Sequence, residues 1–226
     1  MHKKLVNNHP YIAYQKETYG PVESEKRALE FYNWLNTRRT VREFSEKPIS
    51  EKLIENLILA ASTAPSGAHK QPWTFVVVKN KLLKTKIRQA AEQEEKESYE
   101  GRMSDEWIKD LEPLGTDWQK PFLEIAPYLI VMFKRSYEFE PDGKKHQNYY
   151  VTESCGIAAG FLLAAIHQAG LVALTHTPSP MNFLSHILGR PSNEKPFLLI
   201  PVGHPAEETW VPDLKRKGID EICIWF

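Results

Sequence analysis

Four short apolar runs constrain the fold of this chain more than any other feature of its sequence. A run of this kind, cut off by polar or turn residues, predicts a buried β-strand. The first, for example, stops at the polar pair Lys79-Asn80. We therefore expect four buried strands, interspersed with helices. The runs cover residues 74–78, 126–133, 171–174 and 196–202.

Three long helices are expected from the spacing of the apolar residues. The first begins after Ser24 and the second after Ser50, because serine is a favoured N-cap and apolar residues follow each one at helical spacing. The third covers residues 153–170, is apolar nearly all round and should end with Gly170 as its C-cap. Its composition predicts a helix that is buried on every side.

Two segments depart from this pattern. Residues 1–23 show no sustained period, so we expect an extended N-terminal arm that lies on a surface. In residues 81–120, 18 of 40 residues are charged, although aromatic side chains such as Trp107 and Trp118 are scattered among them. Both a mobile cover over an active site and a surface helical hairpin anchored by its tryptophans fit this composition. We expect residues 1–226 to form a single domain.

The composition excludes several classes of partner. Lysine plus arginine and aspartate plus glutamate balance at 29 each, so no overall field would draw the protein to nucleic acid or to an anionic membrane. The longest apolar run, residues 156–166, is too short to span a bilayer. Two cysteines do not make a disulfide framework, and the eight histidines lack metal-ligand spacing. We expect a cytoplasmic protein without a metal.

An arginine cluster is the first candidate binding site. Arg38, Arg39 and Arg42 fall within five residues, between two amphipathic helices that cannot spread the charge over a solvated face. Guanidinium groups bind phosphate bidentately, so the cluster predicts a phosphate-bearing ligand. The alternative is that these arginines are solvated or offset the dipole of a helix C-terminus. The chain has no glycine-rich phosphate loop that would hold a nucleotide instead.

Two further features point to ligand or partner contacts. The polar tripeptide Thr175-His176-Thr177 stands where a buried strand emerges, a common place for ligand contacts in α/β proteins. Its histidine is interpreted as a polar loop residue. The tail, residues 222–226, is apolar to its last residue, and an unpaired strand of that kind is an aggregation hazard. The tail should therefore pair with a sheet of this chain or of a partner.

Taken together, these motifs resemble those of the flavin-dependent nitroreductase superfamily and, within it, the iodotyrosine deiodinases. The resemblance runs from about Arg27 to the C-terminus. It implies an α+β, nitroreductase-like fold with a central mixed β-sheet flanked by helices, in an intertwined homodimer that exchanges its C-terminal strands and binds FMN. The motifs are Arg-Arg-Thr-Val-Arg-Glu-Phe at 38–44, Ala-Pro-Ser-Gly-Ala-His-Lys-Gln-Pro-Trp at 64–73, Leu-Gly-Arg-Pro at 188–191, Pro-Val-Gly-His-Pro at 201–205 and Val-Pro-Asp-Leu-Lys-Arg-Lys at 211–217.

The resemblance implies a set of FMN-binding residues. The phosphate and ribityl chain would be bound by the four arginines of the set and by Thr40. The turn Pro65-Ser66-Gly67 of the other subunit would border the flavin ring. Thr177 would be the catalytic residue, because its hydroxyl at the flavin N5 would favour single-electron steps over hydride transfer. The implied FMN-binding residues are Arg38, Arg39, Thr40, Arg42, Pro65, Ser66, Gly67, Thr175, Thr177 and Arg216.

The resemblance also implies a substrate site for the zwitterion of a halogenated tyrosine. Glu95 and Tyr99 are four residues apart, which places them on one face of a helix. In the deiodinases a glutamate, a tyrosine and a lysine at this spacing bind the substrate, and here the lysine is Lys120. The backbone N–H of Ala68 would bind the phenolate. The implied reaction is FMN-dependent reductive dehalogenation, such as 3-iodotyrosine to tyrosine and halide.

Three alternatives remain open at this stage. The chain could be an NAD(P)H-dependent nitro- or quinone reductase on the same fold, a non-catalytic or flavin-fragmenting flavoprotein, or a protein without flavin. The sequence does not choose between NAD(P)H and a separate reductase as the electron donor.

Overall fold

The computed structural model describes residues 3–226, which divide into two compact units. The first unit is Met1–Arg38 and the second is Arg39–Phe226. Among the described residues no helix has both the length and the apolar character needed to cross a bilayer. A single domain over residues 1–226 stays a prediction.

The first unit contains a hairpin and a helix rather than an extended arm alone. Strand β1 (Lys3–Val6) pairs with β2 (His9–Ile12) through a two-residue loop, Asn7-Asn8, in which both asparagines have positive φ. Asparagine tolerates that conformation, which matches the twist of a hairpin. Helix α1 (Pro21–Asn36) begins before the expected cap, Ser24, because Pro21 has a φ suited to the first turn and follows Gly20 at the N-cap.

A five-stranded sheet forms the centre of the second unit. Its strands are β3 (Phe44–Ser45), β4 (Trp73–Val78), β5 (Tyr128–Arg135), β8 (Val172–Ala173) and β9 (Glu194–Pro205). Neighbours follow the order β3-β9-β5-β4, with β8 also on β9, and all of these pairs are antiparallel. An isolated parallel bridge between Thr40 and Ala173 makes the sheet mixed. The four strands predicted from apolar runs are confirmed with small shifts of their ends.

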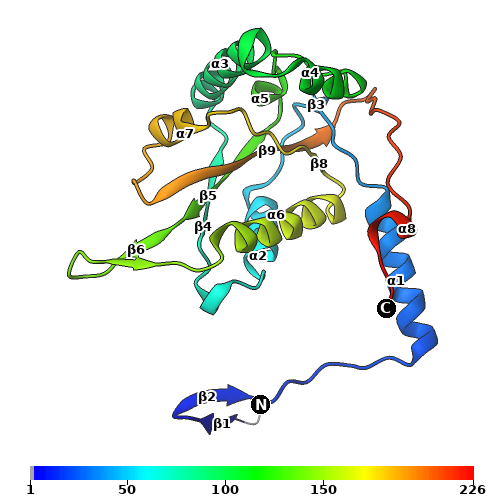
Figure 1. Cartoon of the computed structure of the whole chain (residues 1–226), viewed down its shortest axis with the longest axis vertical. Helices are drawn as coiled ribbons and strands as arrows, with labels where there is room; N and C mark the ends of the chain where they lie inside the picture. Colours follow the sequence, from blue (N-terminus) through cyan, green and yellow to red (C-terminus); the bar gives the residue numbers. More distant parts are fainter. Residues whose placement is uncertain (1–2) are drawn as a thin grey trace. The chain divides into compact units, whose positions relative to one another are not determined.

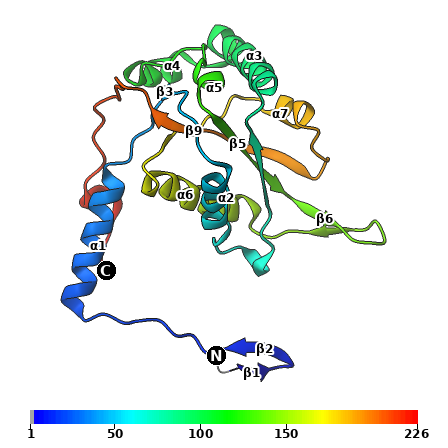
Figure 2. The same cartoon turned by 180° about the vertical axis from the view of Figure 1, so that it is seen from behind.

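Helices cover both faces of this sheet (Figures 1 and 2). On one face lie α2 (Glu51–Ser62) and α6 (Val151–Gln168), which contribute Leu57 and Leu162 to a core with Ile130 and Ile200 of the sheet. Ser50 caps α2 as predicted, since its hydroxyl accepts from the Leu53 N–H at 3.2 Å. The second face lies under α3 (Lys81–Glu97), α5 (Phe122–Ile125) and α7 (Asn182–Ile187).

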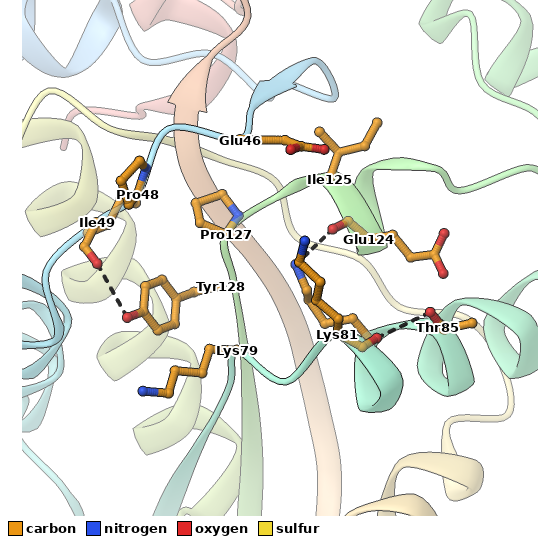
Figure 3. A pocket seen from close by; sticks show the side chains of 11 residues that line it. Glu46, Pro48, Ile49, Lys79, Lys81, Thr85, Glu124, Ile125, Pro127 and Tyr128 are labelled. Carbon is orange, nitrogen blue, oxygen red and sulfur yellow. Dashed lines mark hydrogen bonds between the residues drawn. The ribbon is translucent and has the colours of Figure 1, made fainter.

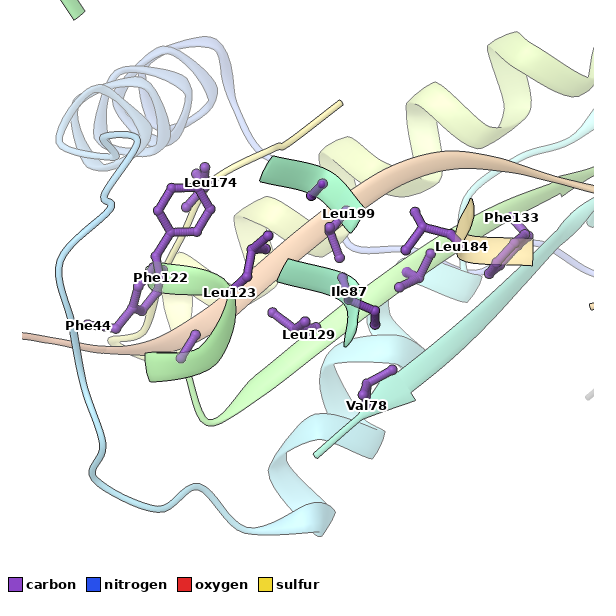
Figure 4. Close-up of a cluster of buried hydrophobic side chains, with 13 residues drawn as sticks. Phe44, Val78, Ile87, Phe122, Leu123, Leu129, Phe133, Leu174, Leu184 and Leu199 are labelled. Atoms are coloured by element: carbon purple, nitrogen blue, oxygen red, sulfur yellow. The ribbon is translucent and has the colours of Figure 1, made fainter. Parts of the chain in front are cut away.

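A second hydrophobic core lies on this other face of the sheet (Figure 4). Ile87 of α3, Leu123 of α5 and Leu184 of α7 are fully buried against Leu129 and Leu199 of the sheet. Burial of such side chains contributes about 1.5–3 kcal/mol each. This packing holds the end of α3 and the start of α5 above the sheet, where the site residues lie.

Helix α6 differs from the prediction on one face. It ends as expected, because Gly170 has a φ of +71° and lets the chain reverse after the last turn. Its small residues Ala158 and Ala159 are buried against the sheet. Ile157 and Phe161, however, are 42% and 43% exposed. The prediction of burial on every side is therefore wrong for the single chain, because the described residues leave these two side chains partly uncovered.

The C-terminal tail does not form the expected strand within its own chain. Helix α8 (Ile219–Ile222) is followed by residues 223–226, which have no regular structure. Ile224 and Trp225 are 80% and 85% exposed. At the same time β4 is an edge strand of the sheet in the described part of the chain. Both the tail and the edge thus remain available for pairing with another chain.

The segment between β4 and β5 is helical rather than irregular. After α3 come a π-helical turn (Ser98–Arg102), α4 (Asp105–Leu111) and a 3₁₀ turn (Glu112–Leu114). A small hairpin of β6 (Tyr137–Phe139) and β7 (Lys145–Gln147) follows β5. Residues 81–120 are therefore largely helical, and their role as a mobile cover stays a prediction.

A buried lysine ties α3 to α5. The Lys84 ammonium donates to the carbonyl oxygens of Glu124 and Ala126 at 2.7 and 2.8 Å, and so satisfies groups left open at the end of α5. Lys84 also borders a cavity of about 520 Å³, the one drawn in Figure 3. Glu46, Pro127 and Tyr128 line the same cavity, and no predicted site residue does.

Replacing Lys84 should destabilise the protein more than replacing its exposed neighbour. Lys84→Met removes two charge-assisted hydrogen bonds and leaves two carbonyl oxygens without a donor. We therefore expect the free energy of unfolding to fall by about 2–3 kcal/mol. Lys86→Met, on the exposed side of the same helix, is the matched control and should change it by less than about 0.5 kcal/mol. Urea unfolding of both variants measures this. Equal effects would show that the Lys84 contacts do not hold α5.

Candidate functional site

A cavity of about 230 Å³ lies where the end of α3 meets the end of β8. Its walls include apolar side chains from the π-helical turn and α4, such as Met103 and Trp107, and Phe122 from α5. Its polar lining contains six of the residues predicted from sequence. These are Arg42, Glu95, Tyr99, Lys120, Thr175 and Thr177.

Local structure aims the substrate-site candidates into this cavity. Glu95 stands in the last turn of α3, and Tyr99 follows in the π-helical turn. The Tyr99 hydroxyl donates to the carbonyl oxygen of Thr116 at 3.1 Å, and Ser98 donates to the Glu94 carbonyl at 2.8 Å. Tyr99 is thereby held against the segment that leads to Lys120.

Glu95 and Lys120 form a buried ion pair. The Lys120 Nζ lies 3.5 Å from the Glu95 Oε2, and the two side chains are 4% and 13% exposed for Lys120 and Glu95 respectively. Lys120 Nζ also donates to the Thr116 hydroxyl at 3.2 Å and to the Asp117 carbonyl. Burial raises the pKa of Glu95 and lowers the pKa of Lys120, and in each case the partner's charge opposes the shift. Removing one partner would leave the other charge buried and uncompensated.

His176 completes this group and was missed by the sequence interpretation. Its Nε2 lies 4.0 Å from the Glu95 Oε1, and its ring meets the Phe122 ring edge to face at 5.7 Å. Burial lowers the pKa of His176 to about 3, and the charges of Lys120 and Arg42 act in the same direction. The imidazole is therefore neutral near pH 7. No signal in the sequence singles it out, because its significance comes from the carboxylate of Glu95 beside it in the folded chain.

The threonines flank His176 at the rim of the cavity. Thr175 and Thr177 are exposed, whereas His176 is buried. Backbone hydrogen bonds in both directions between His176 and Leu199, at 2.8 and 3.0 Å, fix this alternation. A ligand in the cavity can therefore contact the two threonine hydroxyls on the solvent-exposed side and Glu95 on the buried side.

The arginine cluster is joined to the chain's distant basic segment. Arg39 donates a guanidinium N–H to the carbonyl oxygen of Pro212, and the Trp210 N–H donates to the Glu43 carboxylate at 2.7 Å. Arg216 lies four residues beyond Pro212 and is exposed. Arg42 lines the cavity, and burial lowers its pKa, opposed by Tyr99. Arg38 is the last residue of the first unit, whereas the other three arginines belong to the second.

These residues fit a phosphorylated flavin. Arg42 lines the cavity, and the Arg39 guanidinium binds the Pro212 carbonyl oxygen, which ties the arginine cluster to the segment that carries Arg216. Guanidinium groups are well suited to bind a phosphate. Thr40 pairs with Ala173 at the base of β8 and so anchors the cluster beside the threonines. No group of three or more histidine, cysteine, aspartate or glutamate side chains in residues 3–226 is placed to hold a metal ion.

The turn predicted to border the flavin lies elsewhere in this chain. Pro65, Ser66, Gly67 and Ala68 do not line the cavity. Ser66 accepts from the Gln71 N–H at 2.9 Å. A Cβ at Gly67 would lie 2.8 Å from the Tyr149 carbonyl oxygen, so the close approach that requires glycine is made to the chain itself.

This turn stores backbone strain. Ala68, His69 and Gln71 all have positive φ, at 48°, 55° and 47°. Such conformations cost of order 1–3 kcal/mol each for residues other than glycine and gather at ligand-contacting turns. The turn is thus a preformed structure that does not line the cavity of its own chain.

Arg102 is a second residue that sequence interpretation missed. Its guanidinium binds Glu94 at 2.7 Å and also Glu97, and it donates to the Ser179 carbonyl oxygen at 3.2 Å. It therefore ties the π-helical turn to the chain just beyond Thr177. Charged residues are so frequent in this segment that the sequence alone does not single it out.

Comparison with known proteins gives one family model and a set of relatives. The nitroreductase family model matches residues 35–204. The iodotyrosine deiodinase of Haliscomenobacter hydrossis is 65% identical over 207 residues, which cover 92% of this chain and 93% of that protein. Human iodotyrosine deiodinase 1 is 47% identical over 218 residues, which cover 96% of this chain and 75% of that protein.

The fold is similar to that of solved flavoproteins. A crystal structure of oxidised iodotyrosine deiodinase bound to FMN and 3-iodo-L-tyrosine superposes with a TM-score of 0.74 at 28% identity, covering 86% of this chain and all of that chain. A BluB-like flavoprotein from Clostridium difficile superposes with a TM-score of 0.66 at 21% identity, which shows the fold alone. That flavoprotein match covers 86% of this chain and 98% of the other.

The buried His176 predicts an acid sensitivity with a definite sign. The imidazole has a pKa of about 3 when folded and about 6.5 when unfolded, so the unfolded state takes up the proton first. Stability is therefore complete above pH 6.5 and falls as the pH drops toward 3, by about 1.4 kcal/mol per pH unit. The charged side chains of Glu95, Lys120 and Arg42 face the ring at position 176 both in the wild type and in the His176→Phe variant with which it is compared.

The measurement is the free energy of unfolding of the wild type and of His176→Phe between pH 7 and 4.5. The wild-type curve should fall more steeply below pH 6.5, with a difference of about 2 kcal/mol accumulated by pH 5. Parallel curves would mean that His176 is not a buried neutral group.

Proposed function

This chain belongs to the nitroreductase family, and we propose that it catalyses the FMN-dependent reductive dehalogenation of halogenated tyrosines. The observation that carries the proposal is the buried pair of Glu95 and Lys120, which lines one cavity together with Tyr99, Thr175 and Thr177. The names of the relatives, iodotyrosine deiodinases at up to 65% identity, support it. So does the likeness to a deiodinase solved with FMN and 3-iodo-L-tyrosine.

The buried pair suits a zwitterion. An amino acid brings one ammonium and one carboxylate, so it can insert between Glu95 and Lys120 and leave each buried charge with an opposite partner. Glu95 binds the ammonium, and Lys120 and the Tyr99 hydroxyl bind the carboxylate. Charge in the cavity stays balanced, which a nitroaromatic or a quinone cannot achieve because it lacks these groups. Phe122 and Trp107 supply apolar walls for the rest of the ligand.

FMN supplies the two electrons that replace the carbon–halogen bond with a carbon–hydrogen bond, with uptake of one proton and release of halide. Arg39, Arg42 and Arg216, with Arg38 and Thr40, bind its phosphate and ribityl chain. Thr175 and Thr177, which line the cavity, would contact its ring, with the Thr177 hydroxyl as the hydrogen-bond donor to the ring nitrogen N5. The electrons come from NAD(P)H or from a separate reductase.

The functional unit is a homodimer in this proposal. Ile157 and Phe161 of α6 leave an apolar face that another copy can cover. A groove of about 260 Å³ beside the β4 edge is lined by Ile54, Ile58 and Val77, and the exposed apolar tail of a second copy fits this chemistry. We expect the tail to add a strand to β4.

A second copy would also complete the active site. Pro65–Ala68 lies away from its own chain's cavity, so we place this turn at the cavity of the partner. There Pro65, Ser66 and Gly67 border the flavin, and the Ala68 N–H binds the phenolate.

Both cysteines are unpaired, which supports the cytoplasmic location proposed here.

Removing either charge of the buried pair should abolish tight binding of the amino acid. In a titration of the oxidised FMN-bound protein with 3-iodotyrosine, followed by flavin fluorescence, we expect Glu95→Gln and Lys120→Met each to raise Kd by about 100-fold or more. Glu100→Gln and Lys109→Met, at exposed positions of the same segment, are the matched controls and should leave it unchanged. Reduction of a nitroaromatic by the dithionite-reduced protein should be similar in all five proteins. Unchanged Kd values in the first two variants would favour the nitro- or quinone reductase.

The hydroxyl of Thr177 should control the choice of reaction. Thr177→Ala keeps the fold and the substrate site but removes the donor, so dehalogenation should fall by at least about tenfold relative to nitroaromatic reduction. Thr177→Ser retains the hydroxyl and is the control. Rates are measured anaerobically with dithionite, which makes them independent of the natural electron donor. An unchanged ratio in Thr177→Ala would refute this role.

A further inference from the structure

The Glu95 carboxylate, whose side chain is 13% exposed, has a different neighbour at each of its two oxygens. Oε2 faces the Lys120 ammonium at 3.5 Å, and Oε1 faces the His176 Nε2 at 4.0 Å. In the described residues 3–226 this Nε2 is buried and has no hydrogen-bond partner. An unsatisfied nitrogen at that depth is rare and needs an explanation.

Binding of a zwitterion, a step that rests on the proposed function, changes which charge and hydrogen-bond partners the Glu95 carboxylate requires. When Lys120 turns toward the substrate carboxylate, Glu95 loses part of its countercharge and gains the substrate ammonium. A carboxylate has four lone-pair sites, so one ammonium at Oε2 leaves Oε1 in want of a donor. The His176 Nε2 lies on the Oε1 side, 4.0 Å away, and is without a hydrogen-bond partner of its own among the described residues.

We propose that His176 is a positioning residue for substrate recognition: its Nε2–H donates to the Glu95 Oε1 and so orients the Glu95 Oε2 toward the substrate ammonium. The two atoms need to approach by about 1 Å to reach an ordinary hydrogen-bond distance. Glu95 is the partner that moves, because His176 is held by its two backbone bonds to Leu199 and by the Phe122 ring.

The donor has to be neutral for this role. An imidazolium beside Lys120 and Arg42 would add a third positive charge and would compete with the substrate ammonium for Glu95. Burial keeps the ring neutral, in agreement with its lowered pKa. A neutral N–H therefore satisfies Glu95 without reducing the attraction for the ammonium. The ring does not reach solvent at Nε2, so it is not placed to exchange protons during the reaction.

This arrangement predicts selectivity for ligands that carry an ammonium. The probes are 3-iodotyrosine, its analogue without the amino group, 3-(4-hydroxy-3-iodophenyl)propanoate, and 2-iodo-4-methylphenol, which lacks both charges. The variants are His176→Phe, which keeps an aromatic ring against Phe122 but has no donor, and His176→Gln, whose amide keeps an N–H at similar reach. Each FMN-bound protein is titrated with each probe by flavin fluorescence.

We expect His176→Phe to weaken binding of 3-iodotyrosine about tenfold or more, as for loss of a hydrogen bond to a charged group. His176→Gln should restore binding to within about threefold. Neither variant should change binding of the two probes that lack the ammonium. If His176→Phe is recovered without FMN, His176→Met also lacks a donor and takes its place in the same comparison.

Three results would overturn the proposal. Wild-type affinity in the donor-less variant would show that the hydrogen bond is not made. Equal weakening of all three probes would show that the ring only supports packing. Failure of His176→Gln to restore binding would show that the N–H is not what matters. A wild-type protein that does not bind 3-iodotyrosine at all would instead refute the proposed function, so the two failures are distinguishable.

Discussion

The candidate site depends on two opposite charges that the fold holds out of water. Glu95 and Lys120 are nearly inaccessible, and neither could be buried alone without a penalty of several kcal/mol. Each charge therefore requires the other, and the end of α3 and the segment before α5 must close together over the sheet. Such a pair adds little to stability compared with apolar packing. Its value lies in recognition, because it can open to accept a ligand with complementary charges.

A chain of polar contacts transmits this constraint to the surrounding helices. The Lys120 N–H donates to Glu92 at 2.7 Å, and Arg88 binds both Glu92 and Glu124 at 2.7 Å. Lys84 then holds the carbonyls at the end of α5. Side chains from residues 95–120 thus form much of the wall of the cavity.

More of the architecture than of the candidate site could be predicted from the sequence. Buried strands follow directly from apolar runs, and Ser50 and Gly170 marked helix ends by chemistry that acts locally. The α6 prediction failed on the face of Ile157 and Phe161, because an apolar pattern does not say whether a side chain is covered by its own chain or by another. The tail is a related case, since a strand forms only where an edge is offered to it, and its pairing with a partner stays a prediction.

The site residues divide in the same physical way. Glu95, Tyr99 and Lys120 were identified by family resemblance and helical spacing, and the structure brings them to one cavity with Arg42, Thr175 and Thr177. Their roles remain proposals. His176 and Arg102 could not be identified from sequence, because their significance comes from three-dimensional neighbours: a buried carboxylate for one, and two carboxylates and a carbonyl for the other. Sequence spacing contains no information on such contacts.

One titration of the wild-type protein tests whether the buried charge pair is a receptor for a zwitterion. The oxidised FMN-bound protein is titrated with 3-iodotyrosine and with 2-iodo-4-methylphenol under the same conditions, with flavin fluorescence as the signal. Two buried ionic contacts predict that the amino acid binds at least about 1,000-fold more tightly than the phenol. Equal affinities would contradict the role assigned to Glu95 and Lys120, and with it the proposed substrate class.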